Sequence, residues 1–222
     1  MDPSKLQTLI VAIPGILIAI CYHEYAHGWV ANRLGDPTAK AAGRLTLNPL
    51  AHIDPFGTLL LPVILYFMGG FIFGYAKPVP VNFYNLRNPK RDMALVAAAG
   101  PVTNILLALA CTFCLKLTTV FLGATGGAGY FFLEPLSKMF VFAILINVIL
   151  AFFNMMPIPP LDGGRILVGV LPDKQAEAVS RIEPFGIFIV LGIILLNPLG
   201  LYTHTLGAAI RGTFNLLLGI AG

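Results

Sequence analysis

The sequence predicts an all-α polytopic membrane protein with about five to six hydrophobic segments, one of them re-entrant, and a small membrane-associated β-hairpin. Of its 222 residues, 57% are hydrophobic and only 11% are charged, whereas about 25% are charged in a typical soluble domain. Crossing a hydrocarbon core of roughly 30 Å takes about 20 helical residues. Five apolar runs reach or approach that length: residues 6–31, 93–122, 135–153, 184–199 and 201–221.

A sixth apolar segment, residues 56–76, is interrupted by Pro62 and by Gly69-Gly70. Basic residues mark the cytoplasmic side of a membrane protein, and they flank this segment on both sides. They are Arg33, Lys40 and Arg44 before it, and Lys77, Arg87, Lys90 and Arg91 after it. The simplest topology makes residues 56–76 a re-entrant hairpin with the N-terminus outside. A full crossing of the membrane is the alternative.

The stretch HEYAH, residues 23–27, places two histidines and a glutamate at the end of the first apolar run. His23 and His27 are four residues apart, so on a helix they share one face and can bind one metal ion. In this motif two imidazoles hold Zn²⁺, the metal acidifies a water molecule, and the glutamate, here Glu24, takes the proton. A chance match is the alternative, but ionisable residues in a span are costly and usually functional.

Two histidines and a water leave tetrahedral zinc one ligand short. The stretch NMMPIPPLDGGRI, residues 154–166, places an acid after a later span, on a proline-rich segment before two glycines. We therefore expect Asp162 to be the third ligand, because its charge offsets that of the metal near the bilayer. The alternative is a polar turn that leaves the membrane.

The distribution of basic residues predicts the side of the membrane on which the site lies. The loop at 123–134 has no basic residue, whereas 154–183 has three. Both halves of the site are therefore expected on the cytoplasmic side.

Between the first span and the re-entrant segment, residues 38–41 and 44–47 are expected to form two short strands around Gly43. An exposed strand edge could hold an unwound substrate by adding it as one more strand. An interfacial hairpin that only shields the site is the equal alternative. His52, which follows this hairpin, is expected to fix the loop by hydrogen bonding and not to bind metal.

HEYAH combined with NMMPIPPLDGG resembles the site-2 protease family of intramembrane zinc metalloproteases. The stretch AAAGPVTN, residues 97–104, is similar to a third element of that family. The resemblance implies His23, His27 and Asp162 as zinc ligands and Glu24 as the catalytic base. It also implies that Asn154 helps to position the substrate and that Asn104 lines the site. HIDPFGTLLLP and GYAKPVPVN resemble a compact subgroup without PDZ or CBS domains.

These observations predict a single membrane-embedded metalloprotease domain over residues 1–222. The predicted activity is hydrolysis, with one Zn²⁺, of peptide bonds within or near transmembrane segments of substrate proteins, as in regulated intramembrane proteolysis. A non-catalytic zinc-binding scaffold or transporter is the alternative. The expected partners are transmembrane substrates and the lipid bilayer. The net charge of +4 reflects membrane topology and not nucleic-acid binding, and nothing in the sequence sets the oligomeric state. The expected location is the cell membrane, crossed several times.

Overall fold

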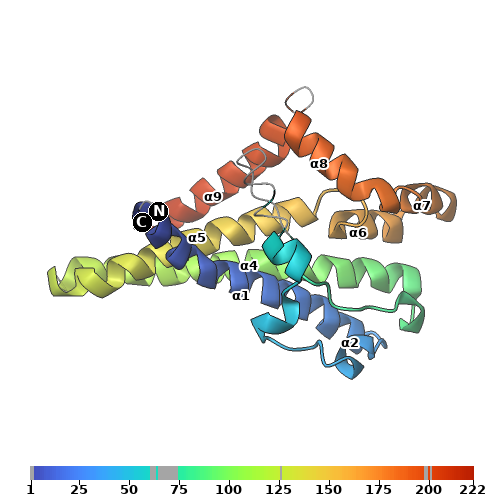
Figure 1. Cartoon of the computed structure of the whole chain (residues 1–222), viewed down its shortest axis with the longest axis horizontal. Coiled ribbons are helices and arrows are strands. Elements are labelled where there is room, and N and C mark those ends of the chain that lie inside the picture. The colour runs from blue at the N-terminus through green and yellow to red at the C-terminus, as the bar shows by residue number, and fades with distance from the viewer. Residues whose placement is uncertain (1–2, 61–63, 65–74, 126, 198–199, 201) are drawn as a thin grey trace.

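The computed structural model describes residues 3–60, 64, 75–125, 127–197, 200 and 202–222, and the regular elements in this part are all helical (Figure 1). The α-helices are α1 (Pro3–Arg33), α2 (Thr38–Ala41), α4 (Pro89–Thr125), α5 (Gly127–Asn154), α6 (Asp162–Val170), α7 (Asp173–Ser180), α8 (Gly186–Leu196) and α9 (Gly207–Ala221). Short 3₁₀ or π turns are η1 (Pro49–His52), η2 (Pro55–Leu60), η3 (Phe83–Asn85), η4 (Glu183–Phe185) and η6 (Tyr202–Leu206).

Three long helices, α1, α4 and α5, pack against one another, and the shorter helices α2, α6 and α9 contact them. Four helical stretches are long and apolar enough to cross a membrane: Ile10–Arg33, Pro89–Ala124, Gly129–Asn154 and Asp173–Leu196. The chain is therefore a multi-pass membrane protein, with four candidate spans in the described part where five to six segments were predicted.

The last predicted segment, residues 201–221, forms the turn η6 followed directly by the 15-residue helix α9, and it is not among the four candidate spans. One side of α9 packs on the bundle, where Ile210 and Leu217 join a buried apolar cluster with Ile144 and Val148 of α5. Burial against α4 and α5 thus accounts for part of the apolar character that suggested a span.

The predicted β-hairpin is wrong. Residues 38–41 form the helical turn α2, and residues 44–47 adopt no regular structure. Alanine at positions 39 and 41 favours helix over strand, and the side chain of Asp36 accepts the backbone N–H of Thr38 at 3.1 Å, which supports the start of the turn. Gly43 lies in the left-handed region at φ 65° and ends the turn. The described residues therefore offer no strand edge here for a substrate.

The central part of the predicted re-entrant segment, residues 61–63 and 65–74, lies outside the described residues, so re-entry itself is not tested. Its two ends are described, and they lie side by side. The backbone N–H of Tyr75 donates to the carbonyl of Gly57 at 3.0 Å, and that of Lys77 donates to the carbonyl of His52 at 2.9 Å. The chain therefore leaves this segment close to where it entered.

Figure 1 shows which elements share an end of the bundle. The helices α2, α6 and α7 lie at one end, together with the start of α4, while both chain termini and the α4–α5 connection lie toward the other. The basic residues Arg33, Lys40, Arg87 and Lys174 belong to the first end. The charge asymmetry of the sequence therefore corresponds to a real asymmetry between the two ends of the molecule.

Candidate metal centre

Helix α1 brings the two motif histidines together, one helical turn apart. Their Nε2 atoms lie 3.0 Å from each other, and the two rings meet nearly at right angles. His23 is buried, with 7% of its surface exposed. The predicted helical spacing thus produces the expected convergence of two imidazole nitrogens on one point.

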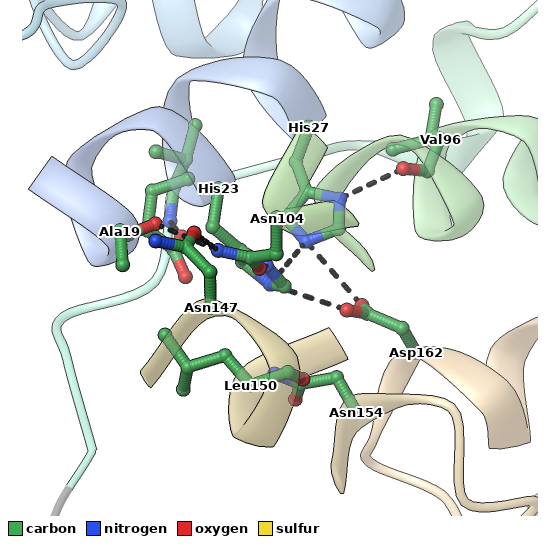
Figure 2. Close-up of polar contacts among 11 residues, drawn as sticks. Ala19, His23, His27, Val96, Asn104, Asn147, Leu150, Asn154 and Asp162 are labelled. Carbon is green, nitrogen blue, oxygen red and sulfur yellow. Dashed lines mark hydrogen bonds and ion pairs between the residues drawn. The ribbon is translucent and has the colours of Figure 1, made fainter. Parts of the chain in front are cut away.

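Asp162 reaches the same point from the first turn of α6. Its Oδ2 lies 3.2 Å from His23 Nε2, and its Oδ1 lies 3.4 Å from His27 Nε2 (Figure 2). The two glycines after Asp162 permit this approach. A Cβ at Gly163 would lie 2.2 Å from the carbonyl oxygen of Met155, and one at Gly164 would lie 2.1 Å from the backbone nitrogen of Pro159.

The other nitrogen of each imidazole is held by an acceptor. His27 Nδ1 donates to the backbone carbonyl of Val96 at 2.7 Å, and His23 Nδ1 lies 2.6 Å from Asn104 Oδ1. The orientation of this amide is fixed, because Asn104 Nδ2 donates to the carbonyl of Ala19 and to Asn147 Oδ1. Both Nδ1 atoms therefore carry the hydrogen, and both Nε2 atoms present a lone pair.

Three observations test whether this arrangement fits a metal ion. The Nε2 lone pairs of His23 and His27 face each other at 3.0 Å, an approach that a shared cation satisfies. Asp162 Oδ2 is buried and has no hydrogen-bond partner among the described residues. Ligand atoms of all three residues lie within 4.8 Å of one another. Two imidazoles and a carboxylate form a donor set suited to Zn²⁺, so the residues fit the ion.

Gly100 of α4 makes room at the same point. A Cβ there would lie 2.5 Å from His27 Nε2 and 2.6 Å from His23 Nε2. Gly100 therefore permits close packing of α4 against the two histidines. Any side chain at position 100 would occupy the space between the ligand atoms.

The charge state of Asp162 suits a ligand. Burial alone would raise the pKa of this carboxyl, but the adjacent imidazoles of His23 and His27 outweigh burial and hold the pKa well below its ordinary value. Asp162 is therefore a carboxylate at neutral pH. It lies in α6, outside the four candidate spans, and its side chain is buried against the two histidines of α1.

Glu24 lies beside the histidine face, as its position in the helix requires. Its Oε2 accepts the backbone N–H of Val79 at 2.8 Å. Val79 belongs to an extended segment that follows residues 56–76, and no sequence pattern predicted this contact. A backbone donor cannot be read from residue type.

The remaining predicted residues lie in different places. Asn104 is fully buried, and its Oδ1 contacts the Nδ1 side of the His23 ring. Asn154 ends α5, and its amide donates to the carbonyl of Leu150 in its own helix (Figure 2). His52 does not join the cluster. It is buried, and its Nε2 contacts the carbonyl of Thr46 at 2.9 Å, as expected for a histidine that fixes this loop.

The chain matches one protein family and is similar to several known proteins. The model of Peptidase family M50 matches residues 11–132 and 130–196. Over 200 residues the chain is 40% identical to "Putative zinc metalloprotease YwhC" of Bacillus subtilis (strain 168), covering 90% of this chain and 85% of that protein. Over 200 residues it is 30% identical to "Putative zinc metalloprotease Rip2" of Mycolicibacterium smegmatis, covering 88% and 70%. No solved structure matches the chain.

The chain belongs to peptidase family M50, the family of the site-2 proteases. This membership confirms the resemblance that HEYAH and NMMPIPPLDGG suggested. It also confirms the predicted enzyme class, a metalloendopeptidase, and the predicted cofactor, zinc.

Proposed function

We propose that this protein is a zinc-dependent intramembrane endopeptidase that cleaves peptide bonds within or near transmembrane segments of other proteins, as in regulated intramembrane proteolysis. The observation that carries the proposal is the convergence of His23 Nε2, His27 Nε2 and an Asp162 carboxylate oxygen at one buried point. This point belongs to a bundle whose helices are long and apolar enough to cross a membrane. The whole chain, residues 1–222, acts as one membrane-embedded domain.

His23, His27 and Asp162 hold the zinc in this proposal. When bound, zinc polarises the carbonyl of the scissile bond and lowers the pKa of the attacking water. The chain's own contribution begins with the ligand supports: Asn104 and the Val96 carbonyl keep both Nε2 lone pairs directed at one point. Such supports around the ligands typically change metal affinity by about 10- to 100-fold.

Glu24 is the proposed general base. With Oε2 occupied by the N–H of Val79, Oε1 is the oxygen that takes a proton from the attacking water. The same carboxyl then gives this proton to the amine that leaves when the peptide bond breaks. Asn154, at the end of α5 near Asp162, is proposed to help hold the substrate backbone.

The site is proposed to face the cytoplasm in the cell membrane. The basic residues of 32–54, 77–92 and 154–183 gather at the end of the bundle that carries α2, α6 and α7. Residues 123–134, which include the end of α4 and the start of α5, contain no basic residue. The excess of positive charge therefore supports a cytoplasmic position for the end that carries α2, α6 and α7.

Comparison of membrane-protein fragments tests the proposal in cells. Cells producing the wild-type protein should accumulate fragments cut in or beside transmembrane segments, and cells producing equal amounts of Glu24→Gln should not. Identical fragment sets from the two kinds of cell would argue against proteolysis by this protein.

A further inference from the structure

The extended segment at residues 77–82 crosses beside the metal centre and contacts Glu24 through one backbone group. Pro78 and Pro80 have no N–H, so Val79 carries the only backbone donor between them. That donor is the one bound to Glu24 Oε2, at 2.8 Å. The sequence of the segment therefore presents a single N–H to the carboxylate and leaves no neighbouring donor to compete for it.

The segment is fixed on both sides of Val79. Arg44 Nη2 donates to the carbonyl of Lys77 at 2.9 Å and to that of Pro78 at 3.3 Å. The N–H of Lys77 donates to the carbonyl of His52. Beyond Val79, the N–H of Asn82 donates to Asp36 Oδ2 at 2.7 Å. These bonds hold the backbone on either side of the Val79 donor.

Side-chain packing fixes the same stretch against α1. Val79 is buried, and a Cβ at Gly28 would lie 3.0 Å from Val79 Cγ1. Gly28 directly follows His27 in the sequence, so this contact lies next to the metal ligands. The distance from the segment to the helix is thus set by the smallest possible residue at position 28.

We propose that Arg44 is a positioning residue for Glu24 and acts through the backbone of residues 77–79. The terminal torsion of a glutamate side chain is broad, so a carboxylate without a fixed partner samples many orientations. The N–H of Val79 fixes Oε2 and thereby directs Oε1. Arg44 holds this N–H in place by binding the carbonyls of the two preceding residues.

This inference rests on the proposed role of Glu24 as the base. An opposite role for the segment would be that of a plug, which keeps Glu24 occupied until substrate displaces it. The two roles predict changes of opposite sign. Loosening a positioning segment lowers turnover, whereas loosening a plug raises it.

The first test measures cleavage of a transmembrane substrate by purified protein in liposomes. Arg44→Ala should lower kcat at least about tenfold, since small misplacement of a catalytic group is costly, with KM and zinc content unchanged. Arg44→Lys keeps a charged donor group and should retain part of kcat. Added guanidinium ion should partly restore kcat in Arg44→Ala. Arg91→Ala, which removes an exposed arginine of α4 outside this network, should match the wild type.

An unchanged or raised kcat in Arg44→Ala would overturn the proposal. Glu24→Gln, assayed beside it, separates this result from failure of the proposed function, because wild-type cleavage by Glu24→Gln would reject the base itself.

The second test does not depend on activity. Hydrogen exchange of the Val79 amide should be slow in the wild type and at least about tenfold faster in Glu24→Ala and Arg44→Ala. Since the prolines at 78 and 80 have no amide hydrogen, the signal from residues 78–80 belongs to Val79 alone. Equal exchange rates in the wild type and both variants would show that neither side chain holds this N–H, and would overturn the proposal.

Discussion

Asn104 Oδ1 lies 2.6 Å from His23 Nδ1, and both side chains are buried between α1 and α4. Asn104 in turn donates to Asn147 Oδ1 at 2.8 Å, and Asn147 donates to the carbonyl of Ala143 in its own helix. One polar chain thus runs from α5 through α4 to His23 on α1, a proposed metal ligand. The chain sets which nitrogen of His23 is free, so Asn104 should control metal affinity.

We predict that Asn104→Ala lowers zinc affinity by about 10- to 100-fold, the usual effect of losing a partner that orients a histidine ligand. Competition with a chelator in detergent measures the affinity. Asn154→Ala is the matched control, because the amide of Asn154 bonds only within its own helix in the described part. Equal zinc affinity of Asn104→Ala and the wild type would contradict this role.

Gly100→Ala should abolish zinc binding while leaving the helices intact. The added Cβ would lie 2.5 Å from His27 Nε2, in the space where the ligand atoms converge. Gly123→Ala on the same helix is the control, because a Cβ there meets nothing within 4 Å. Zinc content by elemental analysis and helix content by circular dichroism distinguish the two effects. Full zinc in Gly100→Ala would mean that the metal lies elsewhere.

Asp162→Ala should reduce bound zinc sharply, because it removes the one carboxylate that lies against both imidazoles. Asp173→Ala serves as the control, since the Asp173 side chain is 95% exposed and pairs with Lys90 away from the centre. Zinc stoichiometry of the purified proteins gives the answer. Undiminished zinc in the Asp162 variant would remove this residue from the ligand set.

The convergence of the three proposed ligands was largely predictable from the sequence, because these residue types and spacings follow simple rules. His23 and His27 share a helix face, and an acid beside a span stands out in so apolar a chain. Asn104 carried a weaker signal of the same kind, a polar residue within an apolar helix. The carbonyl of Val96 and the N–H of Val79 carried none, because every residue has these groups and only the fold selects which ones meet.

The failures of the sequence reasoning have equally local causes. Residues 38–41 were expected as a strand next to a glycine turn, but alanine's helix preference and the support of Thr38 by Asp36 favour a helical turn. The last segment, residues 201–221, was counted among the apolar runs near span length, although Gly207, Arg211 and Gly212 make it the weakest of them. One side of its helix, α9, packs on α4 and α5, and composition cannot distinguish protein from lipid as the apolar partner.

Asp36, which lies outside the candidate spans, is predicted to stabilise the folded protein in a pH-dependent way. Burial would raise its pKa, but hydrogen bonds from Thr38, Asn85 and Asn82 outweigh burial and lower it. A lowered folded-state pKa contributes stability above the unfolded value of about 3.9, and this contribution is lost as the pH falls below it. Asp36→Asn should cost about 1–3 kcal/mol at pH 7, and less as the pH approaches 3.

Unfolding in detergent at a series of pH values measures this difference. Asp173→Asn is the control and should change little, because an ion pair between exposed side chains contributes little to stability. If the difference in unfolding free energy between Asp36→Asn and the wild type stayed constant from pH 7 to 3, this would contradict a role for the charge of Asp36.

The most direct measurement of the central claim is the cleavage rate of a transmembrane substrate by reconstituted Glu24→Gln protein with its zinc content determined on the same sample. Gln keeps the size of the side chain and removes the base. We expect full zinc occupancy and a rate lower by about 10² to 10⁴-fold, the usual contribution of general acid–base catalysis. Cleavage at the wild-type rate by zinc-loaded Glu24→Gln would contradict the account, even if His23, His27 and Asp162 prove to be the ligands.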